Sequence, residues 1–143
     1  MRFAILVCLL ASASCAGDLT GSATTLTGDG KWNATLVTSA TKAGSGVMAL
    51  TLSQNGTTVA GIGTFTDPTD PPAGIFTVSG SVNGSSVALT LLQQPQQYMG
   101  KTIDANQAPV QFAGTLTATT MDGTLNGGGP PAVIALPAHF TKQ

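Results

Sequence analysis

Apolar and polar residues alternate along most of the chain from Trp32 onward. In the segment 47–54, every second residue is large and apolar, namely Met48, Leu50 and Leu52. Because successive side chains of a strand point to opposite faces, this pattern predicts a strand with one buried face. Strand-like segments are expected at 32–38, 47–54, 57–66, 74–82, 85–93, 110–118, 120–125 and 132–142.

Turn signals separate these segments. Asn55-Gly56 and Asn83-Gly84 each lie between two strand-like segments, and such pairs predict hairpins with a type I′ turn. A further turn is expected near Ala118-Thr119, and the polar stretch 93–109 is expected to be irregular. About eight short strands at regular spacing predict an all-β fold, an antiparallel meander that forms a small barrel, with a β-sandwich as the alternative.

The first 14 residues are typical of a secretory signal peptide. Arg2 precedes an apolar run that is far shorter than the roughly 20 residues of a membrane-spanning helix, and small residues follow it. Residues 11–15, ASASC, resemble a relaxed bacterial lipobox, although Ser12 stands where Leu is usual. We therefore expect a lipid on Cys15; ordinary cleavage nearby and a functional thiol are the alternatives.

The rest of the chain divides into two parts. Residues 15–30 are rich in Gly, Thr, Ser and Ala and predict a flexible tether. Residues 31–143 are expected to form a single domain. With Cys15 acylated, the protein would be a membrane-anchored lipoprotein of the bacterial cell envelope, whereas ordinary cleavage would release it as a secreted protein.

The composition narrows the range of partners. Only 8% of the residues are charged, against about 25% in a typical protein, and the formal net charge is −1. Binding to a phosphate backbone depends on clustered Lys and Arg, so we expect no nucleic-acid partner. The 42% hydrophobic content favours a folded domain over a disordered chain.

Gly30-Lys31-Trp32 at the start of the first strand resembles the G-x-W signature of lipocalin-like barrels. The pattern of Gly, Thr and apolar residues in the later strands is similar to that of small bacterial lipoproteins of uncharacterised function with this fold. The resemblance implies that Trp32 plugs one end of an up-and-down barrel, and that an apolar cavity binds a small ligand. The Arg that stacks on this Trp in lipocalins has no counterpart here outside the signal segment.

If such a cavity is open, residues from several strands would line it. The candidates are Trp32, Met48, Leu50, Phe76, Val78, Leu89 and Phe112. The alternative is a filled core, because an eight-stranded barrel is just wide enough for side chains to fill it.

Few residues suit catalysis or metal binding. His139 is the single histidine, and a small hydrolase would have to combine it with Asp67 or Asp70. Asp67-Pro68 and Asp70-Pro71 also fit turns. We expect no metal, no cofactor and no enzymatic activity. The sequence thus predicts an exported, lipid-anchored, non-enzymatic β domain with a binding or surface-structural role. A small hydrolase and an apolar-ligand carrier are the alternatives. Apart from the membrane, the partner would be a small apolar ligand or another protein.

Overall fold

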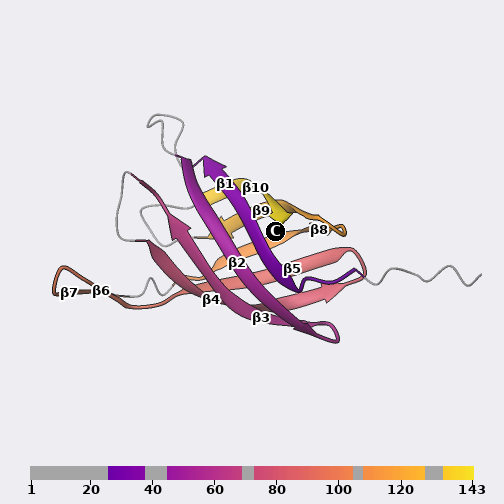
Figure 1. Ribbon diagram of the computed structural model, residues 1–143, viewed down its shortest axis with the longest axis horizontal. Helices are drawn as coiled ribbons and strands as arrows, with labels where there is room; N and C mark the ends of the chain where they lie inside the picture. Colours follow the sequence, from indigo (N-terminus) through magenta and orange to yellow (C-terminus); the bar gives the residue numbers. More distant parts are fainter. Residues whose placement is uncertain (1–25, 38–44, 69–72, 105–107, 128–133) are drawn as a thin grey trace, which may run out of the picture.

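The computed structural model describes residues 26–37, 45–68, 73–104, 108–127 and 134–143, and these residues form an all-β domain (Figure 1). The predicted signal peptide and Cys15 lie outside the described residues. The strands of the main sheet are β1 (Gly30–Val37), β2 (Ser45–Asn55), β3 (Thr58–Thr66), β4 (Gly74–Asn83), β5 (Ser86–Gln93), β8 (Val110–Leu116), β9 (Thr120–Gly127) and β10 (Ile134–Lys142). The described residues contain no helix long and apolar enough to cross a membrane.

The eight strands form a closed barrel in the order β1-β10-β9-β8-β5-β4-β3-β2, and every neighbouring pair is antiparallel. This confirms the predicted all-β meander barrel and excludes the β-sandwich. The strand number and the up-and-down order are consistent with a lipocalin-like fold. The barrel closes where β1 meets β10, and that pairing covers only Trp32↔Lys142 and Asn33↔Thr141.

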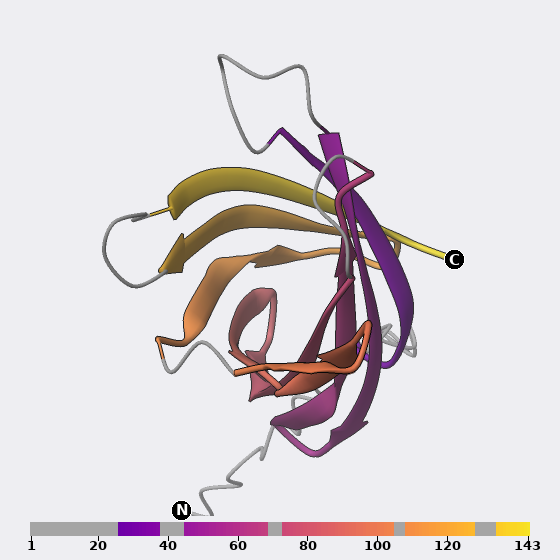
Figure 2. The ribbon, with the colours of Figure 1, turned by 90° about the vertical axis from the view of Figure 1, so that its left-hand side faces the viewer.

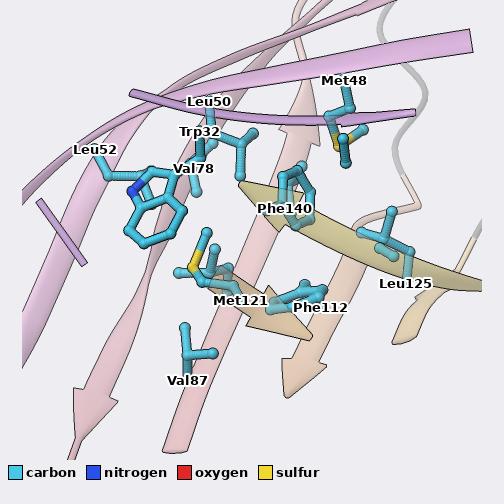
Figure 3. Close-up of a cluster of buried hydrophobic side chains, with 14 of the residues drawn as sticks. Trp32, Met48, Leu50, Leu52, Val78, Val87, Phe112, Met121, Leu125 and Phe140 are labelled. Carbon is cyan, nitrogen blue, oxygen red and sulfur yellow. The ribbon is translucent and has the colours of Figure 1, made fainter. Parts of the chain in front are cut away.

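The alternating pattern predicted the inner face correctly. In β1 the buried residues are Trp32, Ala34 and Leu36, while the residues between them are exposed. Eighteen buried apolar side chains, contributed by all eight strands, make a single core among the described residues (Figure 3). No buried polar side chain occurs among the described residues, so burial of apolar area is the main stabilising term in this interior.

The two predicted hairpins form, but their turn type differs from the prediction. Asn55 pairs with Thr58, so the loop residues are Gly56 and Thr57 rather than Asn55 and Gly56. Gly56 has a φ of 61°, and neither Asn55 nor Thr57 has a positive φ. One positive φ at the first loop position is the feature of a type II′ turn. The β4–β5 hairpin repeats this arrangement with Gly84, whose φ is 58°.

The stretch 93–109, expected to be irregular, contains a hairpin of its own. β6 (Gln96–Tyr98) pairs with β7 (Lys101–Ile103) and projects from the barrel (Figure 1). Its loop residues Met99 and Gly100 have φ values of 50° and 75°. Two positive values are the feature of a type I′ turn, which therefore occurs here and not at the Asn-Gly positions.

The domain begins before the predicted boundary at residue 31. Leu26 packs against the core, and the backbone N–H of Gly28 donates to Gln54 Oε1 at 2.6 Å. The Gln54 N–H in turn donates to Asp29 Oδ1. The last residues of the expected tether are therefore part of the folded domain, because they supply hydrogen bonds to the end of the barrel.

Candidate functional site at the open end of the barrel

The two ends of the barrel are built differently. At one end, here called the closed end, lie the short β2–β3, β4–β5 and β8–β9 turns, and residues 26–29 lie against the first two of these turns. At the other, the open end, lie the longer connections after β1, β3, β5 and β9. Figure 2 views the barrel from the open end, where β8, β9 and β10 diverge from β1, β2 and β3.

Trp32 is the centre of the closed end. Its indole is fully buried, and Nε1 donates to the Gly28 carbonyl oxygen at 2.9 Å. Lys142 Nζ lies 5.2 Å from the Trp32 ring centroid, within the range of a cation–π interaction. A cation thus covers the tryptophan even though the expected arginine is absent. The alternating pattern alone could not predict that Lys142 contacts Trp32, because this contact joins the first and last strands of the barrel.

A cavity of about 180 Å³ lies inside the open end, and its lining is wholly apolar. It is lined by Leu36, Met48, Phe65, Phe76, Val110, Leu125 and Leu136. These residues come from β1, β2, β3, β4, β8, β9 and β10, and most of them lie close to the open ends of their strands. The interior of the barrel is therefore filled around Trp32 and hollow at the opposite end.

The structure divides the predicted cavity residues between these two regions. Met48 and Phe76 line the cavity. The other five, Trp32, Leu50, Val78, Leu89 and Phe112, are at most 3% exposed and belong to the packed core. Figure 3 labels all of these except Leu89. Phe112 packs edge-on against Phe140 with ring centroids 5.4 Å apart. The alternation of apolar and polar residues identified the side chains that point into the barrel, but it did not reveal how far along the barrel axis each one lies.

The five lining residues missing from the predicted set are Leu36, Phe65, Val110, Leu125 and Leu136. Each of them is spaced by an even number of residues from the buried residues of its strand, so the sequence did predict that its side chain points inward. Leu36 and Leu125 also belong to the buried core, and what all five residues share is nearness to the open end of their strands. That position became clear only when the register of the closed barrel aligned the strand ends.

His139 lies on the outer face of β10, directly opposite Asp122 on β9. His139 Nδ1 and Asp122 Oδ1 form a hydrogen bond, and both side chains are largely exposed. The hydrogen bond from His139, followed by the one from the Thr120 hydroxyl, lowers the pKa of Asp122 below its usual value. The pair borders a surface groove of about 490 Å³ beside β1.

This pair differs from the hydrolase set considered above. Among the described residues, those lining the His139 groove include Asp122 but not Asp67. Asp67 follows β3 and is half-buried, and Asp70 lies outside the described residues. The contacts described for His139 include a carboxylate that orients the ring, but no hydroxyl or thiol nucleophile. Within the described part of the chain, no three potential metal ligands lie together.

Comparison with known proteins adds no relative: no protein-family model matches the chain, and no curated protein matches it significantly.

Proposed function

We propose that this protein is a non-enzymatic binding protein that holds a small apolar ligand in the cavity at the open end of the barrel. The observation that carries the proposal is a cavity with a wholly apolar lining in an otherwise filled barrel. Interiors of proteins are packed about as densely as organic crystals, so a hollow of this size departs from the rule. An unfilled apolar cavity costs stability, and a function would explain why the barrel keeps one.

Size and lining define the class of ligand. A cavity of about 150 Å³ lined by Leu, Ile and Phe accepts benzene, and this cavity is slightly larger at about 180 Å³. It suits one aromatic ring or the end of an alkyl chain. Because no polar atom lines it, a charged or hydrogen-bonding group would have to remain at the mouth, where burial does not strip its water.

Titration with an alkylbenzene series tests the proposal. We expect saturable binding that strengthens by about 0.8 kcal/mol for each added methylene and levels off when the cavity is full. The Cys15→Ser variant is the preferred material, because it lacks the lipid acceptor and needs no detergent that would compete for the site. Absence of saturable binding across the whole series would refute the proposal.

A matched pair of variants locates the binding. Val110 lines the cavity, whereas Val47 lies on the outer face of β2 with 46% of its surface exposed. Val110→Phe adds a ring inside the hollow and is expected to weaken ligand binding by about tenfold or more. Val47→Phe makes the same change outside the barrel and is expected to leave the affinity unaltered. Equal effects of the two variants would count against the cavity as the site.

We further propose export and a lipid anchor on Cys15, as the N-terminal sequence indicates. The described chain enters the barrel at Leu26, which packs at the closed end. An anchor there would attach to the end opposite the cavity, so the mouth would be free to meet ligand. Intact mass and N-terminal analysis of the protein from its host membranes tests this. An acylated Cys15 supports it, and an unmodified chain that starts elsewhere refutes it.

A further inference from the structure

The join between β1 and β10 is the weakest in the barrel. It comprises two residue pairs at the closed end, whereas every other neighbouring pair of barrel strands covers six to nine. Beyond Asn33↔Thr141 the two strands continue without pairing to each other, and Figure 2 shows them diverging toward the open end. We call this unpaired part, residues 34–37 of β1 and 134–140 of β10, the open seam.

Pro137 lies in the part of β10 that does not pair with β1. The N–H of Gln143 donates to the Lys31 carbonyl oxygen at 2.9 Å, so Gln143 directs its backbone groups toward β1. Because these directions alternate along a strand, Thr141, His139 and Pro137 also face β1. In the continued register Pro137 would stand opposite Val37. A proline has no N–H to donate, and sheets tolerate it at an edge that faces no neighbour.

The same alternation identifies the backbone groups that face the open seam, where the described residues of β1 and β10 show no pairing to each other. On β1 these are the backbone N–H and C=O groups of Thr35 and Val37. On β10 they are those of His139 and Ala135, together with the Pro137 carbonyl. Two strand edges therefore face one gap, and each presents the pattern of donors and acceptors that pairs with an added strand.

A groove of about 490 Å³ lies along the open seam. Its lining residues are Thr35, Val37, Asp122, Gly123, Pro137, Ala138 and His139. Asp122 brings a carboxylate to it, held by hydrogen bonds from His139 and Thr120. Beside the groove, Val37 and Val47 leave 67% and 46% of their surfaces exposed on neighbouring strands. The groove thus combines unpaired backbone, one carboxylate and an apolar rim.

We propose that the open seam is a docking site for an extended peptide segment of another protein, which adds to the barrel as a β-strand. Main-chain hydrogen bonds to Thr35 and Val37 would supply affinity, as in other cases of strand addition. The Asp122 carboxylate selects a segment that carries Lys or Arg. Apolar side chains at alternate positions would cover Val37 and Val47. The groove lies on the outer side of the barrel and shares no lining residue with the apolar cavity, although β1 and β10 contribute to both.

The test uses the full chain and a panel of labelled heptapeptides in which Thr and Val alternate and one Lys moves along the peptide. We expect at least one peptide to bind saturably below about 1 mM, measured by fluorescence anisotropy. The same peptide with N-methyl groups at alternate residues keeps its side chains but loses donors along one edge. It should not bind. If no peptide in the panel saturates, the proposal is overturned.

Variants connect the binding to the seam. Val37→Pro removes an N–H that faces the gap and is expected to weaken the best peptide by about tenfold, whereas Val37→Ile keeps both the N–H and the apolar side chain and should keep the affinity. Asp122→Asn should weaken the same peptide by about threefold or more. A urea unfolding midpoint close to that of the parent shows that Val37→Pro is folded. Equal affinity of the folded Val37→Pro variant and the parent would overturn the proposal.

Sedimentation of the full chain without peptide separates a partner from a second copy. The proposal expects no self-association that depends on Val37. A dimer that Val37→Pro dissociates would mean that another copy of this chain occupies the seam, and it would overturn the assignment to a partner peptide. Neither result bears on ligand binding in the cavity, which the alkylbenzene titration measures independently.

Discussion

The same strands are packed differently at the closed and the open end of this barrel. At the closed end, Trp32 is fully buried and hydrogen-bonded, Lys142 covers its ring, and residues 26–29 bond to Gln54. At the open end the strands separate, a wholly apolar cavity remains, and the β1–β10 join is unpaired. Under the proposed function, the filled end stabilises the barrel and the hollow end binds the ligand.

The largest expected difference between the ends comes from the same substitution made in each. Phe140 is fully buried near the closed end, and Phe140→Ala is expected to lower the free energy of unfolding by about 3–5 kcal/mol. Phe76 is half-buried against the cavity, so Phe76→Ala should cost less, about 1–2 kcal/mol. Urea unfolding of both variants measures the difference. Equal costs would mean that the two ends are packed alike.

A second comparison concerns the hydrogen bonds that hold residues 26–29. Gln54→Ala removes the acceptor of the buried Gly28 N–H and is expected to cost about 1–2 kcal/mol. The control is Gln111→Ala, because Gln111 accepts only an exposed hydrogen bond from Thr90. That change should cost less than about 0.5 kcal/mol. Faster amide exchange at Gly28 in Gln54→Ala would show that the loss is local; unchanged exchange would contradict the role given to Gln54.

The smallest expected effect depends on pH at the edge of the open seam. The pKa of Asp122 is lowered in the folded protein, chiefly by the hydrogen bond from His139. The carboxylate therefore stabilises the fold above its unfolded pKa, and this contribution disappears as the pH falls through the lowered folded pKa. Both groups are exposed, so the effect should be small.

Urea unfolding midpoints of the parent and Asp122→Asn, compared from neutral to acid pH, measure this contribution. We expect the two proteins to differ most at neutral pH and to converge in acid. Asp104→Asn serves as the control, since it removes an exposed carboxylate away from the β9–β10 pair. A gap between parent and Asp122→Asn that stays constant down to strongly acid pH would contradict the pairing with His139.

The strands and their inner faces could be predicted from the sequence, because alternation is a local property. Met48, Leu50 and Leu52 have the burial that their positions predicted. At Gly61 in β3 the backbone of the neighbouring strand comes close, and the β2–β3 register is continuous through this residue. A Cβ at Gly61 would lie 2.1 Å from the Thr51 carbonyl oxygen.

The features that distinguish the two ends depend on contacts between distant parts of the chain. The β6–β7 hairpin was missed because its turn places Met99, a residue that rarely adopts a positive φ, in the left-handed region. Lys142 reaches Trp32 only once β10 lies beside β1. The sequence could not predict either that Pro137 faces β1 in the unpaired part of β10. A proline in a strand does not reveal which of the two neighbouring strands it will face.

The most direct test of this account is methyl NMR of the Cys15→Ser protein during titration with an alkylbenzene. The account predicts saturable shifts at Leu36, Val110, Leu125 and Leu136, which line the cavity. It predicts no shifts at Val59 and Val82, which pack beside the N-terminal residues at the closed end. Shifts confined to the closed end, or no saturable shift at any methyl group, would contradict the claim that the open end is the binding end.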